Sequence, residues 1–303
     1  MLAFAKETKN FKGLFSVVLF ALLLASSVAS ATLSSAPNCG DQKSSGEAPY
    51  DLTKHRDNVN EMAFRLFEYL NGNVSRVALV SRAGGDLSDH NFRDPEEQKY
   101  THTGIAWRHS EDGRWRFKHL LNVCQGEGSD LFVQGLAPFF NDDPFYYDIV
   151  IGVPSEDLQE EIAAILEDDE ASYRLTTSRY SNIANPFVAE YQNCNNWVLN
   201  VIASAQSGIG DMEGVIDYYA GRGYRPSAVK INWLKGFVGS LLTANMTLDD
   251  HSPEEKRTRW FNFASAASLY DYLDQSGELI LWDEVCHPAG CNIPLLELNS
   301  YDR

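Results

Sequence analysis

Residues 101–121 read THTGIAWRHSEDGRWRFKHLL, and this stretch gives the strongest indication of the fold. Two runs that bear aromatic residues, 101–108 and 114–121, flank the segment HSEDG. Asp112-Gly113 is typical of hairpin turns, which need residues that tolerate positive φ angles. The sequence therefore predicts an antiparallel hairpin in which His102 and His119 stand side by side on neighbouring strands. The alternative for each imidazole is an ordinary surface or core histidine.

The segments around the hairpin predict further strands and helices. Apolar residues at helical spacing indicate helices, which we expect over residues 55–70, from Ser155 onward, from about Cys194 onward, and over 211–221, 230–245 and 264–275. Extended segments are expected at 74–81, 146–153, ELILWDEV and IPLLELN, the last two joined by a CHPAGC turn. Antiparallel strand pairs mixed with helices predict one α+β domain, an antiparallel sheet packed against helices.

The segment YQNCNNWVLNVIA, residues 191–203, contains a candidate nucleophile. Cys194 lies where a polar loop turns into an apolar helix. Unpaired N–H groups and partial positive charge at a helix N-terminus favour the thiolate, which is the reactive form of cysteine. The same N–H groups can bind a developing oxyanion. The alternative is a buried structural cysteine or a disulfide partner.

The N-terminal residues indicate export. Three lysines, an apolar run over residues 14–28 and the small-x-small pattern Ala29-Ser30-Ala31 are the features of a secretory signal peptide, residues 1–31. An uncleaved anchor helix is the alternative. Cleavage removes three Lys and one Glu, which changes the formal net charge from −17 to −19. We expect a secreted or periplasmic protein without stable membrane insertion. So acidic a chain also argues against binding nucleic acid or anionic lipid.

Five cysteines remain after cleavage, so they cannot all pair within one chain. Cys286 and Cys291 enclose a Pro-Gly turn and are expected to form a disulfide. Cys39 and Cys124 are candidates for a second disulfide, which would tie an exposed arm, residues 32–53, to the body. Cys194 would then remain free.

The ordered motifs YTHTGIAW, RWRFKHLL and YQNCNNWVLN resemble those of circularly permuted papain-like enzymes. That group includes the lecithin–retinol acyltransferases and bacterial relatives of the NlpC cell-wall peptidases, and its order is His, polar residue, Cys. With LVSRAGGDLS and FFNDDPFYYD, the chain also looks like the uncharacterised bacterial domain-of-unknown-function family 2145. The resemblance implies a permuted papain-like catalytic core over 54–205 and a C-terminal extension, with helical patterns, over 206–303.

The resemblance also implies roles for individual residues. Cys194 would be the nucleophile, His102 its general base, and His119 the residue that orients His102. The backbone N–H of Cys194 would form part of an oxyanion hole, with Gln192 or Tyr191 as a further donor. A longer hairpin, the Asn195-Asn196 pair and the extension depart from the group's pattern and weaken any transfer of substrate class.

Three functions compete at this point. The first is an exported cysteine hydrolase, amidase or acyltransferase that acts on cell-wall peptide or acyl substrates and needs no cofactor and no metal. The second is a non-catalytic periplasmic binding or assembly factor that retains the fold. The third is a zinc site made by His102, His119 and Cys194. Aromatic residues near the proposed site would line a groove or belong to the core: Tyr100, Trp107, Tyr191 and Trp197.

Overall fold

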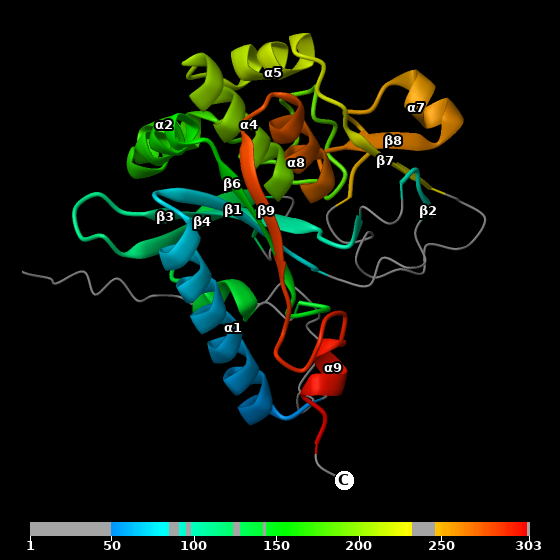
Figure 1. Ribbon diagram of the computed structural model, residues 1–303. Coiled ribbons are helices and arrows are strands. Elements are labelled where there is room, and N and C mark those ends of the chain that lie inside the picture. Colours follow the sequence, from blue (N-terminus) through cyan, green and yellow to red (C-terminus); the bar gives the residue numbers. More distant parts are fainter. Residues whose placement is uncertain are drawn as a thin grey trace, which may run out of the picture. The chain divides into compact units, whose positions relative to one another are not determined.

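A six-stranded antiparallel sheet organises the part of the chain that the structure describes (Figure 1). The computed structural model describes residues 50–84, 91–94, 98–123, 128–141, 144–231 and 246–301. The strand order is β5-β4-β3-β1-β6-β9. The strands are β1 (Val77–Arg82), β3 (His102–Arg108), β4 (Trp115–Asn122), β5 (Ser129–Gln134), β6 (Ile149–Pro154) and β9 (Leu279–Val285). A smaller sheet has the order β2-β7-β8, with β2 (Asn91–Phe92), β7 (Ser227–Lys230) and β8 (Trp260–Phe263).

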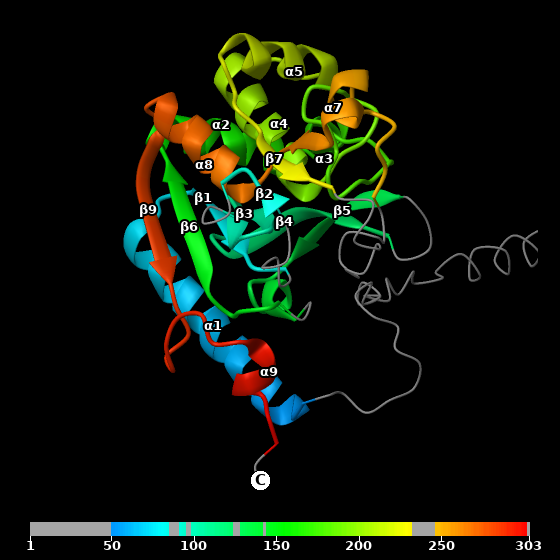
Figure 2. The ribbon, with the colours of Figure 1, turned by 90° about the vertical axis from the view of Figure 1, so that its right-hand side faces the viewer.

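Helices cover both faces of the larger sheet and also pack against the smaller one. They are α1 (Leu52–Asn73), the short 3-10 helix η2 (Ala137–Phe140), α2 (Glu156–Glu167), α3 (Asp169–Arg174), α4 (Cys194–Ser207), α5 (Met212–Gly221), α7 (Pro253–Thr258), α8 (Ala266–Gln275) and α9 (Leu295–Leu298). Figure 2 shows α1 on one side of the sheet and α2, α4 and α8 on the other. The predicted α+β class, with antiparallel sheets packed against helices, is confirmed.

The hairpin that dominates the sequence is present as β3 and β4. Gly113 has a φ of 67° in the connecting turn, which a residue without a Cβ adopts at little cost. The paired part of the ladder runs from Ile105 opposite Lys118 to Arg108 opposite Trp115. The turn chemistry at Asp112-Gly113 therefore sets the register that brings His102 and His119 to the same end of the hairpin.

Strand residues alternate between two hydrophobic cores, as the period of two requires. Ile105 and Trp107 pack with α2, α4 and α8 in one core, whereas Ala106 packs with α1 and η2 in the other. Helix α1 buries Val59, Met62, Leu66 and Leu70, which share one face at three- and four-residue spacing. The predictions of helices near 55–70, after Ser155, after Cys194 and over 211–221 and 264–275 are confirmed.

The closing segment IPLLELN was predicted as a strand, and this prediction is wrong. Residues 295–298 form α9 instead, and Leu295 is buried while Leu296 is 57% exposed. Short apolar runs suit a strand and a buried helical turn equally well, so periodicity alone does not separate them. The tertiary contact decides: Leu295 and Leu298 both pack into the α1 core, one helical turn apart.

Several predictions concern residues outside the described ranges. The candidate signal peptide, residues 1–31, lies outside them, as does the arm up to residue 49. Most of the helix expected over 230–245 also lies outside them, and its first residue, Lys230, ends β7. Every helix in the described residues is too short or too polar to cross a membrane.

Candidate active site

Two buried imidazoles contact each other at the open end of the β3–β4 hairpin. His102 Nε2 and His119 Nδ1 are 2.9 Å apart. Gly104 makes this contact possible, because a Cβ at that position would lie 2.1 Å from the Phe117 ring and 2.9 Å from His119 Cβ. Phe117 and His119 therefore fill the space that the missing side chain of Gly104 leaves beside His102.

An aromatic ring from η2 covers the imidazole pair. The centre of the Phe139 ring lies 5.9 Å from that of His102 and 6.1 Å from that of His119. Arg82 lies directly opposite His102 in the β1–β3 ladder, and its guanidinium carbon lies 5.2 Å from the centre of the Phe139 ring. The two imidazoles and the Arg82 guanidinium therefore all lie against the Phe139 ring.

Cys194 is the first residue of α4, as the sequence predicted for a helix start. The preceding residue, Asn193, caps the helix: its side chain accepts from Asn196 N–H, and the Asn196 side chain accepts in return from Asn193 N–H. Asn193 Nδ2 also donates to the carbonyls of Asn182 and Ala264, both at 3.1 Å. The position of the thiol is therefore fixed by the cap and by residues on both sides of it in the chain.

The sulfur of Cys194 contacts the backbone that carries His102. Sγ donates to Thr101 O at 3.8 Å, and the N–H of Thr103 points toward the sulfur. Thr101 O and Thr103 N–H come from the residues directly before and after His102. They lie at the start of β3, beyond the part of this strand that pairs with β4. Among the described residues, no hydrogen bond joins Sγ to either imidazole. The structure brings His102 and His119 together and places the thiol beside the main chain of His102.

Burial dominates the electrostatics of the thiol. Cys194 is 4% exposed, and burial raises the pKa of its thiol above the ordinary value. The N–H of Thr103, the charge of Arg82 and the N–H groups of Asn195 and Cys194 act in the opposite direction by stabilising the thiolate. The resting thiol is therefore protonated, which agrees with its donation to Thr101 O.

Burial also keeps both imidazoles neutral. It lowers the pKa of His102 well below the usual value, and the charges of Arg82 and His119 lower it further. Burial and then Arg82 lower the pKa of His119 to about 3. Neutral imidazoles each carry one proton, so one ring donates and the other accepts in the His102–His119 contact. The ring nitrogen left over on His102 is Nδ1, which has no hydrogen bond among the described residues.

Two residues of this site escaped the sequence analysis. The charge of Arg82 lowers the pKa of both imidazoles and of the thiol, so its guanidinium acts on all three groups. Burial raises the pKa of Tyr180 well above the usual value, and the charge of Cys194 and a hydrogen bond to it add to this effect. Arg82 comes directly after the strand predicted over 74–81, and Tyr180 lies within the polar loop before α4, so only the pairing of β1 with β3 and the path of that loop reveal them.

The other residues predicted near the site have structural contacts. Gln192 Nε2 donates to Leu175 O at 3.0 Å, and Gln192 Oε1 accepts from Thr177 N–H at 3.2 Å. The Tyr191 hydroxyl contacts Arg179, whose guanidinium also lies over the Tyr191 ring. Tyr100, Trp107 and Trp197 are buried in the core on the α4 side of the sheet. These five side chains therefore have structural partners or core positions in this structure.

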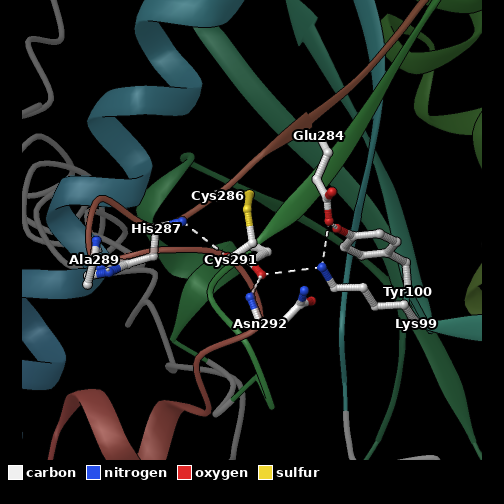
Figure 3. Close-up of a disulfide and its surroundings, with 9 residues drawn as sticks. Lys99, Tyr100, Glu284, Cys286, His287, Ala289, Cys291 and Asn292 are labelled. Atoms are coloured by element: carbon white, nitrogen blue, oxygen red, sulfur yellow. Dashed lines mark hydrogen bonds and ion pairs between the residues drawn. A yellow bond between two sulfur atoms is a disulfide. The ribbon is translucent and has the colours of Figure 1, made fainter.

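The predicted disulfide between Cys286 and Cys291 is confirmed (Figure 3). Asp148 organises the enclosed turn by accepting from His287 N–H at 3.1 Å and from Asn292 N–H at 2.6 Å. Lys99 bridges the Asp148 and Glu284 carboxylates, at 3.3 Å and 2.5 Å. The predicted Cys39–Cys124 pair lies outside the described residues. Cys194 is a free thiol.

One group of residues in the described ranges has the spacing of a metal site. It consists of Asp148, Glu284 and Cys286, and it does not include His102, His119 or Cys194. Cys286 is bonded to Cys291, so its sulfur is not a thiolate ligand. Lys99 already forms ion pairs with both carboxylates. This arrangement fits an ion-paired support for the disulfide turn better than a metal centre.

Comparisons with known proteins agree with part of the resemblance in the sequence. Residues 69–273 match a family described as "Uncharacterized protein conserved in bacteria (DUF2145)". The searches of curated proteins and of solved structures found no match. The matched region covers more than half of the 303 residues and contains Arg82, His102, His119, Tyr180 and Cys194. The chain therefore belongs to the bacterial domain-of-unknown-function family 2145.

Proposed function

We propose that this protein is an exported cysteine hydrolase that forms a thioester on Cys194 and retains the permuted order of papain-like enzymes, with His102 and His119 before the cysteine. One observation carries the proposal. The chain has a free thiol at the start of a helix, and its sulfur contacts the backbone on both sides of a histidine that is hydrogen-bonded to a second histidine.

The first half of the reaction needs a base, because the buried thiol is protonated at rest. Cys194 turns from Thr101 O toward His102 Nδ1 and gives its proton to that nitrogen. The sulfur then attacks the acyl carbon, and the electron pair of the C=O bond moves to the oxygen. When the tetrahedral intermediate collapses, the bond to the leaving group breaks and the imidazolium returns the proton to that group.

The second half is the reverse sequence with water. His102 Nδ1 removes a proton from water, the hydroxide attacks the thioester carbon, and the sulfur leaves and regains the proton. His119 keeps the His102 ring in place through both halves and disperses the positive charge of the imidazolium. The same thioester could pass to another acceptor, which would make the enzyme an acyltransferase.

Donors for the oxyanion lie at the start of α4. The N–H groups of Cys194 and Asn195 point to the side of the sulfur, and the Tyr180 hydroxyl lies against it. These groups lower the energy of a developing negative charge next to Sγ. Tyr180 takes the place that the sequence analysis assigned to Tyr191 or Gln192, because the side chains of those two residues already have partners.

The substrate class that we propose is an amide or ester of a cell-wall peptide or acyl group outside the cytoplasm. The signal-peptide pattern predicted over residues 1–31 and the acidic composition support this location. The burial of Cys194, which is 4% exposed, favours a second candidate. In that case the protein is a periplasmic binding or assembly factor that keeps the fold but does no chemistry.

The pH profile of Cys194 alkylation by iodoacetamide separates the two candidates. If His102 is the base, alkylation of the native protein at pH 6–7 exceeds that of the His102→Gln variant at least tenfold, because general-base assistance is worth about 10²–10⁴ in rate. His109→Gln is the matched control, since His109 lies on the same hairpin outside the site. Equal rates in all three proteins would favour the binding factor.

A further inference from the structure

Gln134 ends β5 next to the imidazole pair. It lies directly opposite Phe117 in the β4–β5 ladder, and His119 is two residues along β4. Residues opposite each other, and those two apart on one strand, share a face of the sheet. Gln134 therefore lies on the face that carries Phe117 and His119, immediately before the segment that places Phe139 over the two imidazoles.

Two buried polar atoms, one on His119 and one on Gln134, have no partner within strict hydrogen-bond geometry among the described residues. They are His119 Nε2 and Gln134 Oε1. One is the only nitrogen of His119 not used by His102, and the other is an obligatory acceptor. The two side chains are nevertheless close enough that Gln134 opposes the lowering of the His119 pKa. A small adjustment joins them, and leaving both unpaired in the core would be costly.

The direction of this contact determines the protons on both rings. An amide oxygen only accepts, so His119 must carry its proton on Nε2. His119 Nδ1 is then an acceptor, and the 2.9 Å contact to it requires the proton of His102 to be on Nε2. His102 Nδ1 is left without a proton, as a base toward the thiol needs.

We propose that Gln134 is a positioning residue, which fixes the tautomers of His119 and His102 so that His102 Nδ1 is free to accept the proton of Cys194. This role rests on the proposed hydrolase function for its consequence, but the tautomers can be observed without any reaction. The relay runs from Gln134 Oε1 through His119 and His102 to the side of the sheet edge where Cys194 lies.

The test is the ¹⁵N NMR spectrum of the imidazole rings, measured at pH 7 on the mature protein. We expect protonated Nε2 and unprotonated Nδ1 on both His102 and His119 in the native protein. Gln134→Leu removes the acceptor and should shift the tautomer ratio of His119 about three- to tenfold, the factor that one ordinary hydrogen bond supplies. Gln134→Glu keeps an acceptor, so it should retain the tautomers and raise the pKa of His119.

Val133→Leu is the matched control, since Val133 neighbours Gln134 on β5 and is 52% exposed. A proton on His102 Nδ1 in the native protein would mean that Gln134 presents its amide nitrogen, and would overturn the proposal. Unchanged ring signals in folded Gln134→Leu would overturn it as well. If Gln134→Leu does not fold, the native and Gln134→Glu spectra decide alone.

Iodoacetamide alkylation of Cys194 in the same samples separates this proposal from the proposed function. Tautomers that respond to Gln134 as expected, together with a thiol that reacts no faster than in His102→Gln, would refute the hydrolase and leave the tautomer control intact. A thiol activated by His102 in both native protein and Gln134→Leu, with unchanged tautomers, would refute the role of Gln134 alone.

Discussion

Gly104→Ala should destabilise the protein through the imidazole pair. A methyl group at this position would lie 2.1 Å and 2.7 Å from two atoms of the Phe117 ring and 2.9 Å from His119 Cβ. Real Cβ contacts essentially never fall below 3.0 Å, so the Phe117 ring, the β4 backbone or both must move. Phe117 is fully buried and packed at 4.1 Å from the centre of the Phe139 ring, so it has little room to yield.

The expected cost follows from overpacking of a dense core, which is about 1–3 kcal/mol. For a domain of this size that corresponds to a fall in Tm of roughly 2–10 °C. Because the displaced β4 backbone carries His119, we also expect a weaker contact with His102. Alkylation of Cys194 at pH 6–7 should therefore slow together with the loss of stability.

Urea unfolding followed by tryptophan fluorescence measures the change, and Gly72→Ala is the matched control. Gly72 lies in α1 with no atom within 4 Å of a built Cβ, so alanine there should be neutral or stabilising by up to about 1 kcal/mol. A Gly104→Ala protein as stable as the native one, with unchanged alkylation, would refute the role of Gly104 in admitting His119.

Three further results are expected. Unfolding should become easier as pH falls below about 6.5, because the folded state holds both imidazoles at lowered pKa and only the unfolded chain takes up their protons. At pH 5 the loss from His119, whose pKa in the folded state is about 3, is about 2 kcal/mol, and His102 acts in the same direction. Urea unfolding of a His102→Leu, His119→Leu double variant should show little of this loss, whereas His109→Gln should keep it. Replacing Cys286 and Cys291 by serine should lower the free energy of unfolding by about 2 kcal/mol, which is the loop-closure entropy that so short a loop supplies. Alkylation of Cys194 should not change. A changed alkylation rate would mean that the disulfide turn and the surroundings of Cys194 are coupled. Asn193→Ala should lower the free energy of unfolding by about 1–3 kcal/mol, because it removes the helix cap and the bonds to Asn182 O and Ala264 O. The control is Ser155→Ala, which removes the α2 cap and should destabilise the protein without slowing the alkylation of Cys194.

The elements with strong local signals were predictable from the sequence. Asp112-Gly113 fixed the hairpin, and helical spacing located α1, α2, α4, α5 and α8. Residues 295–298 were not, because a short apolar run has no distinctive period. The β2-β7-β8 sheet was missed for a related reason: its strands have two to four residues each and are paired across long sequence distances.

The site was predictable where chemistry and local structure coincide. His102 and His119 stand out because the hairpin turn defines their register, and Cys194 because a loop changes into a helix there. No local sequence signal distinguishes Arg82, Tyr180 and Gln134. They reach the site through the β1–β3 pairing, the polar loop before α4 and the β4–β5 pairing, and none of these follows from the spacing of residues in one segment.

The C-terminal segment is part of the site's support. Ala264 O accepts from the side chains of Asn193 and Asn195, which flank Cys194. His251 Nε2 bonds Ile183 O at 2.8 Å, and Asp250 accepts from Asn185 N–H at 2.8 Å. Residues 250–264 thus hold the loop that leads into α4, and the proposed core depends on them to place the thiol.

The formation of a thioester on Cys194 tests the central claim most directly. The protein is mixed with p-nitrophenyl acetate at neutral pH, quenched in acid within the first turnover, and digested for mass spectrometry. Our account predicts an acetyl group on Cys194 in the native protein, a much smaller amount in His102→Gln, and none at this position in Cys194→Ser under the same conditions. Equal acetylation of native protein and His102→Gln, or an unmodified Cys194 in both, would contradict it.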